Sequence, residues 1–86
     1  MTIAYVLINT EKGKEAEVLK QIRGIENIKE AHTVYGVYDL IVKVEANSMR
    51  ELKKVLNEIR KIDNVRATMT TVCAESEKQE KKEDSM

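Results

Sequence analysis

The residues best suited to chemistry lie in the segment YGVYD at residues 35–39. A glycine at the first central position of a two-residue hairpin suits a type II′ turn, because glycine takes the positive φ of that position at little cost. The turn explains Gly36 but not Asp39, a carboxylate between Tyr38 and Leu40 at the start of an apolar run. Such a carboxylate can pair with a ligand ammonium group or with a Lys or Arg of a neighbouring subunit.

Two hydroxyl groups form a second candidate site. The stretch VRATMTTV at residues 65–72 reads as a strand, so Thr68 and Thr70 share one face while Met69 and Thr71 share the other. Two hydroxyls on one face can bind a carboxylate or an amide. Threonine also has high strand propensity and tolerates a half-exposed face, so a purely structural role explains the same pattern.

The other reactive side chains are isolated. His32 is the only histidine and Cys73 the only cysteine, and the sequence has no Ser-His-Asp, Cys-His, Cys-x-x-Cys or phosphate-loop pattern. A lone histidine without a cysteine or carboxylate at ligand spacing makes a poor metal site. We therefore expect His32 to be a structural strand residue and Cys73 a small buried hydrophobe in the last strand. No catalytic residue, metal or cofactor is predicted.

These residues need a scaffold, and the sequence predicts one made of two similar halves. Residues 18–34 resemble residues 55–71, an offset of 37 positions from residue 18 to residue 55. The identical pairs are Val18 and Val55, Leu19 and Leu56, Ile22 and Ile59, Arg23 and Arg60, Ile25 and Ile62, Asn27 and Asn64, and Thr33 and Thr70. Two copies are too few for a solenoid but fit two strand-helix-strand halves.

Local signals divide the chain into six elements. Hydrophobic periodicity predicts strands at residues 2–9, 28–35, 38–46 and about 65–75, and helices at about 14–23 and 48–62. Gly24 can end the first helix in a left-handed conformation. Ser48 and Glu51 form a capping box at the start of the second. The order is that of an α+β, ferredoxin-like β-α-β-β-α-β sandwich, with a four-stranded antiparallel sheet and two helices on one face.

The bulk properties limit the possible functions. The 86 residues allow one domain, at 1–75, followed by a charged tail at 76–86 that is predicted to be disordered because it has almost nothing apolar to bury. Lys plus Arg equals Asp plus Glu at 15 each, without the basic excess typical of nucleic-acid binding. No apolar stretch approaches the roughly 20 residues of a membrane span, and no signal peptide is evident. We expect a cytoplasmic protein that contacts neither DNA nor membrane directly.

The first strand is apolar on both faces. Its alternating sets are Ile3, Tyr5 and Leu7 on one face and Ala4, Val6 and Ile8 on the other. Two helices can cover only one face of the sheet. The other face is therefore expected to pack against a second copy, giving a symmetric dimer and a dimeric α+β barrel. The third strand supports this only in part, because Lys43 and Glu45 interrupt its apolar pattern.

Taken together, these elements resemble the ligand-binding and oligomerisation (RAM) domain of the Lrp/AsnC family of feast/famine transcriptional regulators. The segment GVYDL at 36–40 matches that family's G-x-Y-D-hydrophobic hairpin, and VRATMT at 65–70 matches its last-strand pattern. The resemblance covers residues 2–75. It implies sheet-paired dimers, rings of dimers and an amino-acid effector held between dimers. The ligand-binding residues that it implies are Gly36, Tyr38, Asp39, Thr68 and Thr70.

Two features set the chain apart within this resemblance. The family's regulators begin with a helix-turn-helix DNA-binding segment, whereas this sequence begins at the first strand. It therefore resembles a stand-alone sensory domain, which would assemble with itself or with full-length Lrp/AsnC regulators and modulate transcription without binding DNA. Tyr35 stands where the resemblance implies a smaller residue, and its bulk would narrow or fill the ligand cleft.

Two other functions fit the same sequence. Small dimeric α+β-barrel enzymes, such as cofactor-independent oxygenases and isomerases, share this order of elements. His32, Tyr5 and Tyr38 are the only residues that could serve such an enzyme, and no base–orienter pair is evident among them. A purely structural oligomeriser would use the same Thr and Asp residues for bonds between subunits. We expect a regulatory module rather than an enzyme.

Overall fold

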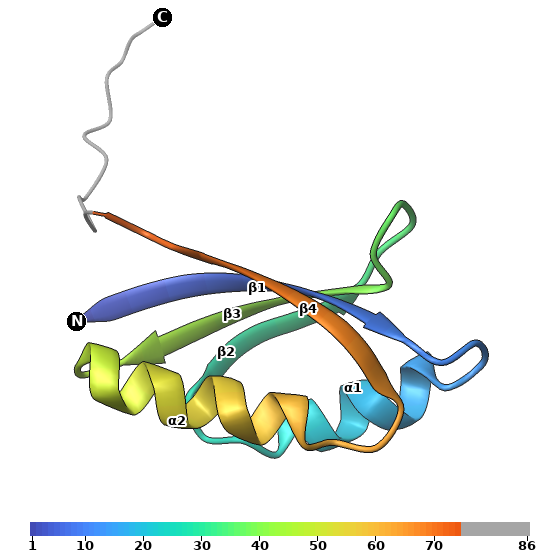
Figure 1. The fold of residues 1–86 in the computed structure, drawn as a ribbon, viewed down its shortest axis with the longest axis horizontal. Coiled ribbons are helices and arrows are strands. Elements are labelled where there is room, and N and C mark those ends of the chain that lie inside the picture. The colour runs from blue at the N-terminus through green and yellow to red at the C-terminus, as the bar shows by residue number, and fades with distance from the viewer. Residues whose placement is uncertain (75–86) are drawn as a thin grey trace, which may run out of the picture.

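A computed structural model describes residues 1–74 and has the predicted order of four strands and two helices (Figure 1). The elements are β1 Thr2–Thr10, α1 Glu15–Arg23, β2 Ile28–Thr33, β3 Leu40–Ala46, α2 Met49–Arg60 and β4 Val65–Val72. The predicted β-α-β-β-α-β fold is therefore confirmed. The predicted end of the domain at residue 75 and the tail at 76–86 lie outside the described residues.

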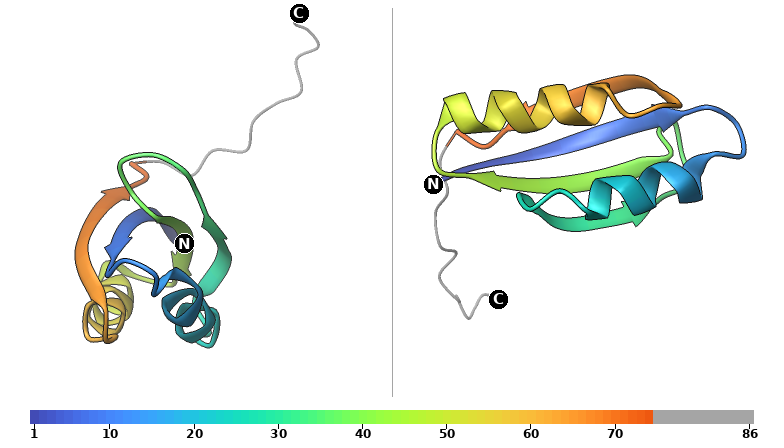
Figure 2. Two further views of the ribbon diagram at one scale, coloured as in Figure 1. Left: turned by 90° about the vertical axis from the view of Figure 1, so that its right-hand side faces the viewer. Right: turned by 90° about the horizontal axis from the view of Figure 1, so that it is seen from below.

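The strands form one antiparallel sheet in the order β2-β3-β1-β4. In the centre, β1 pairs with β3 from Thr2 opposite Ala46 to Ile8 opposite Leu40. Both helices lie on the same face of this sheet, and the opposite face carries neither (Figure 2). The prediction that the helices cover only one face is therefore confirmed, and the packing of the other, open face against a second copy stays a prediction.

The core lies between the helices and the covered face. Its fully buried side chains are Ala4, Val6, Ile8, Val18, Ile22, Leu40, Val42, Val44, Leu52 and Ile59. Those from β1 and β3 are alternate residues, as a strand with one face on the core requires. Each buried Val, Ile or Leu contributes about 1.5–3 kcal/mol relative to exposure. Thr10, at the end of β1, is the only buried polar side chain among residues 1–74.

The predicted capping box at the start of α2 is half correct. Ser48 precedes the helix, and its Oγ accepts a hydrogen bond from the Glu51 backbone N–H at 3.1 Å. The Glu51 carboxylate, however, accepts from the backbone N–H of Asn47 at 2.9 Å rather than from that of Ser48. The carboxylate is drawn one residue further back because its second oxygen binds Asn27, which lies on another element.

The prediction that Gly24 takes a left-handed conformation at the end of α1 is wrong. Its φ is −81°, in the right-handed region, and its N–H donates to the Gln21 carbonyl at 3.1 Å. Ile25 N–H donates in the same way to Ile22 O at 2.9 Å. The helix thus ends in a tightened last turn, which satisfies the terminal carbonyls without a left-handed residue.

The β2–β3 connection is longer than the predicted two-residue turn. The strands separate at Thr33 and Leu40, and residues 34–39 form a loop closed by a bond from Val34 N–H to the Asp39 carbonyl at 2.9 Å. Gly36 has φ 154°, a value that favours glycine. Figure 1 shows this loop rising on the side of the sheet away from the helices.

Candidate functional site

The β2–β3 loop folds Asp39 back onto the end of β1. Asp39 Oδ2 accepts hydrogen bonds from Thr10 N at 2.8 Å and from Thr10 Oγ1 at 3.4 Å. The Asp39 N–H donates to the Ile8 carbonyl at 2.9 Å. One carboxylate oxygen therefore holds the loop to the sheet. Within residues 1–74 the other oxygen, Oδ1, has no hydrogen-bond partner.

A hollow of about 430 Å³ opens beside Asp39 at the ends of the strands. We call it the strand-end site, and its lining residues are Asn9, Thr10, Asp39, Arg66 and Ala67. Arg66 contacts the Glu11 carboxylate at 3.7 Å, and both side chains are more than half exposed. The site therefore combines a carboxylate with a guanidinium group. That is the complement of a zwitterion, which carries one ammonium and one carboxylate.

Sequence reasoning did not identify Thr10 or Arg66 as site residues. The duplication could have drawn attention to Arg66, because both halves carry a basic residue at this position, Lys29 in the first and Arg66 in the second. Both residues lie at irregularities of strand pairing, Lys29 in β2 and Arg66 opposite the Asn9–Thr10 step of β1. A bulged residue is left unpaired and re-aims its side chain.

Tyr35 lies on the other side of Asp39. It lines a second hollow of about 340 Å³ together with Glu15, Thr33, Val34 and Asp39. Its side chain is fully exposed, at 106% of the reference area. Within one chain Tyr35 therefore leaves Asp39 accessible, and its narrowing of a cleft between dimers stays a prediction.

Tyr38, from the predicted ligand set, lies on the open-face side of the sheet. Its hydroxyl donates to Met69 Sδ at 3.8 Å, and Met69 is paired with Leu7. Gly36 lies in the exposed part of the loop. Neither of these two residues lines the strand-end site.

Thr68 and Thr70 lie on the covered side of the sheet. They pair with Ile8 and Val6, which are buried beneath the helices. Arg60 Nε donates to Thr68 Oγ1 at 3.5 Å, whereas the buried Thr70 Oγ1 has no partner among the described residues. No hydrogen bond joins either threonine to Asp39 or Tyr38 within residues 1–74, so a shared ligand site for all five residues stays a prediction.

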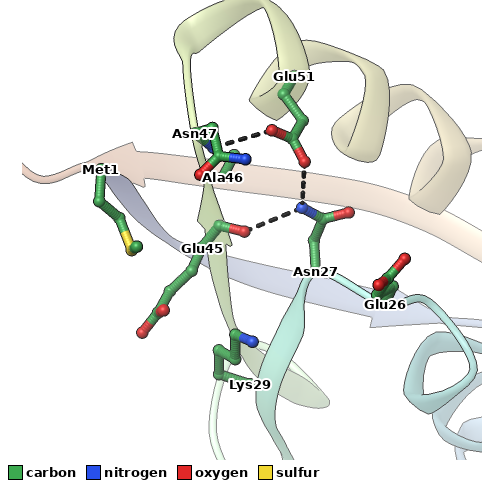
Figure 3. A pocket seen from close by; sticks show the side chains of 8 residues that line it. All are labelled: Met1, Glu26, Asn27, Lys29, Glu45, Ala46, Asn47 and Glu51. Carbon is green, nitrogen blue, oxygen red and sulfur yellow. Dashed lines mark hydrogen bonds between the residues drawn. The ribbon is translucent and has the colours of Figure 1, made fainter.

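The opposite end of the sheet has a hollow of about 240 Å³ whose lining includes the Glu51 carboxylate, and both oxygens of this side chain accept hydrogen bonds from the protein itself (Figure 3). Asn27 Nδ2 donates to Glu51 Oε2 at 2.8 Å and to the Glu45 carbonyl at 3.0 Å, and Asn47 N–H donates to Glu51 Oε1. These bonds, that from Asn27 first, lower the pKa of Glu51 from its usual 4.5. We call this arrangement the Asn27 clamp, and its bonds serve to hold the elements together.

The duplication relates the two ends of the sheet. Thr10 and Asn47 are equivalent positions, 37 residues apart, and each gives its N–H to a carboxylate. The strand pairing differs, however. Val65 pairs with Thr10, whereas its counterpart Ile28 pairs with Val44, three residues before Asn47. This offset brings Asn27 beside Glu51 at one end only.

The open face is apolar at its centre. The residues that form it are Ile3, Tyr5, Leu7, Ile41 and Met69, with Tyr5 40% and Met69 51% exposed. Its β2–β3 side carries an ion pair between Lys43 and Glu45 at 3.8 Å. Contiguous apolar surface of this kind is typical of interaction sites.

His32 and Cys73 have no catalytic surroundings. His32 Nε2 lies 3.4 Å from Glu30 Oε1, and both side chains are exposed on edge strand β2. Cys73 lies one residue beyond β4 and is partly exposed, so its predicted burial within the last strand is wrong; it donates its N–H to the Ile3 carbonyl at 2.8 Å. Among residues 1–74 no cluster of three metal-ligating side chains is present.

The comparisons with known proteins identify the family. The model of the Lrp/AsnC ligand binding domain matches residues 3–83. The chain belongs to the Lrp/AsnC family. The HTH-type transcriptional regulator FL11 of Pyrococcus abyssi is 32% identical over 77 residues, which are 90% of this chain and 51% of FL11. The chain thus spans about half the length of this relative. The Lrp/AsnC relationship places it in a family of transcriptional regulators.

Two further proteins are similar to this chain over very different shares of their own length. The crystal structure of hypothetical protein PHS023 from Pyrococcus horikoshii is 39% identical, with a TM-score of 0.82 over 88% of this chain and 93% of that one. Homocitrate synthase of Sulfolobus acidocaldarius is 36% identical over 55 residues, which are 64% of this chain and 12% of the enzyme. In residues 1–74 no helix is both long and apolar enough to cross a membrane.

Proposed function

We propose that this Lrp/AsnC domain senses a free amino acid at the strand-end site and transmits the signal by assembling with other copies. It acts on transcription through that assembly and catalyses no reaction. The observation that carries the proposal is that Asp39, whose Oδ1 has no partner within residues 1–74, and Arg66 line the same open hollow. A family defined by ligand binding supports the same role.

Each charged group of the site has a role in the proposal. Asp39 Oδ1 accepts from the ligand ammonium while Oδ2 keeps its bond to Thr10. Arg66 exchanges its long, exposed contact with Glu11 for the ligand carboxylate, which it can bind with two parallel hydrogen bonds. Gly36, Tyr38, Thr68 and Thr70 contribute only if the loop or a neighbouring copy brings them to the ligand.

The open face is the proposed assembly surface. A second copy would cover the apolar centre and form a dimeric α+β barrel, and rings of such dimers would follow. Leu7→Lys places a charge in this centre and is expected to lower the mass measured by light scattering while circular dichroism stays unchanged. Lys20→Gln, on the exposed side of α1, is the matched control. An unchanged mass for Leu7→Lys contradicts this assembly surface.

We further propose that the protein acts with full-length regulators of its family. With 15 basic and 15 acidic residues, it lacks the charge excess that direct DNA binding favours. FL11 is about twice as long as the segment it shares with this chain. Mixed assemblies would therefore change the number and spacing of the regulators' DNA-binding segments. Finding no mixed oligomers on co-expression argues against this step.

Thermal unfolding with each of the twenty amino acids tests the sensing proposal. A ligand at 100 times its Kd stabilises the folded state by about 2.7 kcal/mol. One or a few amino acids should raise the melting temperature of the wild type, and Asp39→Asn or Arg66→Gln should abolish the rise. Glu11→Gln, which removes only the outer partner of Arg66, should retain it. A wild type indifferent to all twenty contradicts the proposal.

A second candidate function is the regulation of an enzyme rather than of transcription. It is favoured by the match to a segment that makes up 12% of a homocitrate synthase. In that case the chain binds an enzyme and changes its turnover in response to the same ligand. The test is to mix the protein with the homocitrate synthase of Sulfolobus acidocaldarius, and to measure both the mass of the mixture and the turnover of the enzyme. No complex and no change in turnover exclude it.

A further inference from the structure

A groove runs between α2 and the edge strand β4, apart from the strand-end site. It encloses about 320 Å³, and its lining residues are Met49, Leu52, Lys53, Leu56, Asn57, Arg60 and Val72. The α2 members recur at helical spacing and form one continuous stripe. None of these residues lines the strand-end site, so the α2–β4 groove is a separate feature.

The charges along this groove have one sign. Its accessible apolar walls come from Met49, Leu56 and Val72, whereas Leu52 is fully buried beneath them. Its two charged residues are Lys53 and Arg60. No carboxylate lines the groove, and within residues 1–74 none forms an ion pair with either cation. An apolar trough with uncompensated positive charge is complementary to an apolar group that carries an anion.

The guanidinium of Arg60 is oriented but not fully used. Its Nη1 donates to Asn57 Oδ1 at 3.4 Å and its Nε to Thr68 Oγ1 at 3.5 Å, both long contacts. Arg23 occupies the equivalent position in the other half, and its Nη2 donates to the Ala31 backbone carbonyl at 2.9 Å. Arg23 thus has a strong bond to a neighbouring strand, whereas Arg60 keeps donor capacity for an anion.

The hydroxyl of Thr70 is a second unexplained group here. Thr70 lies on the covered side of β4, between Thr68, which contacts Arg60, and Val72, which lines the groove. Its Oγ1 is buried without a hydrogen-bond partner in the described part of the chain. Buried polar atoms nearly always have a partner, so an orphaned one calls for an explanation.

We propose that the α2–β4 groove binds a small amphipathic carboxylate, with its acid group on Arg60 and its apolar part along Met49, Leu56 and Val72. Lys53 adds a second positive charge at the rim. The buried Thr70 hydroxyl lies next to Thr68 on the same face of β4, and its unused donor turns to the ligand carboxylate. This site is independent of the proposed amino-acid site and places a second ligand class on the same domain.

The test is a nuclear magnetic resonance titration of the full-length ¹⁵N-labelled protein with sodium octanoate. Saturable amide shifts are expected in α2 and at the Val72 end of β4, and not at Asn9, Asp39 or Arg66 of the strand-end site. 1-Octanol, which has the same chain length without the charge, should bind at least tenfold more weakly, since a hydrogen bond to a charged group contributes more than the roughly 1.4 kcal/mol that a tenfold change represents. Shifts scattered over the surface, equal binding of octanol or no saturable shift each overturn the proposal.

Variants separate the roles of the individual groups. Arg60→Gln is expected to raise the Kd of octanoate about tenfold, whereas Lys61→Gln, outside the groove lining, should leave it unchanged. Thr70→Val keeps the side-chain shape and removes the hydroxyl, so it should weaken octanoate binding severalfold while raising the melting temperature of the unliganded protein. If octanoate shifts only residues 75–86, the tail is the binding partner and the groove proposal fails.

Discussion

At each end of the β1–β3 pair, a side-chain carboxylate accepts a hydrogen bond from a backbone N–H at the end of a central strand. The N–H group belongs to Thr10 at the end of β1 and to Asn47 just after β3. At the Asn27 clamp, both oxygens of Glu51 are used, one by Asn47 N–H and one by the Asn27 amide. At the strand-end site, Asp39 uses one oxygen on Thr10, and the other has no partner within residues 1–74. Equivalent positions of a duplicated chain thus support a closed clamp at one end and an open hollow at the other.

The difference arises from the two asparagines of the duplication. Asn27 and Asn64 are equivalent, and each accepts through its backbone carbonyl, from Glu45 N–H at 3.0 Å and from Glu11 N–H at 2.9 Å. Only Asn27 also uses its side chain, whereas Asn64 has a positive φ of 77° and no side-chain bond within residues 1–74. The hydrogen bonds of Asn27 therefore stabilise one end of the sheet, whereas at the other end Asp39 keeps an oxygen that a ligand can use.

Replacing the two asparagines tests this contrast most strongly. Asn27→Ala is expected to lower the free energy of unfolding by about 2 kcal/mol, because the amide bonds to Glu45 and Glu51 are lost. Asn64→Ala should cost no more than about 1 kcal/mol, for the positive φ alone. Urea denaturation at one protein concentration measures both. Equal losses at the two positions show that both ends are equally closed.

Asp39→Asn tests the open end. The amide oxygen can still accept from Thr10, so the stability loss should be about 1 kcal/mol or less. The Kd of the sensed amino acid should rise at least tenfold, about 1.4 kcal/mol, because the ammonium loses its carboxylate. Calorimetry compares this variant with Glu15→Gln, which alters the neighbouring hollow only. Unchanged affinity in Asp39→Asn places the ligand elsewhere.

Ser48→Ala tests the closed end through its helix cap. Loss of the bond from Glu51 N–H to Ser48 Oγ should lower stability by about 1 kcal/mol, and Ser48→Gly should cost only a few tenths. Urea denaturation ranks the two variants. The affinity for the sensed amino acid should not change in either variant. A tenfold change in affinity would show that the helix cap and the strand-end site are energetically coupled, contrary to the contrast drawn between the two ends.

The smallest effect is a pH dependence at the Asn27 clamp. The folded-state pKa of Glu51 is lowered by its bonds from Asn27 and Asn47, so its contribution is complete above its usual value of 4.5 and is lost as the pH falls through the lower folded value. Wild-type stability should therefore fall more steeply below pH 4.5 than that of Glu51→Gln. Glu58→Gln, a control on α2 outside the clamp, should follow the wild type. Identical slopes for Glu51→Gln and the wild type contradict the clamp.

The sequence predicts the elements better than it predicts the contacts between them. The strands, the helices and the Ser48 cap follow from local periodicity and from residues three apart. The apolar residues on both faces of β1 predict that each face is packed, one by the helices and the other by a second copy. The bond between Asp39 and Thr10 joins residues 29 apart, and that between Asn27 and Glu51 residues 24 apart. Such pairs depend on the register of the strands. No local sequence feature predicts that β2 is offset along β3 by three residues relative to the pairing of β4 with β1.

The loops show the same limit. Gly36 correctly indicates a backbone turn, but the length of the loop is set by where β2 and β3 stop pairing, which depends on the Asp39 anchor. Arg66 became a site residue only through the bulge that leaves it unpaired. The family pattern named Asp39, and the geometry adds Thr10 and Arg66 to it.

Mass-resolved light scattering of the full chain, alone and with each of the twenty amino acids, is the decisive measurement of amino-acid sensing through assembly. We expect an assembly larger than the 9.9 kDa chain whose size or stability responds to at least one amino acid, with the response absent in Asp39→Asn. A 9.9 kDa monomer, or an assembly indifferent to all twenty, would contradict the claim that this domain senses an amino acid through assembly.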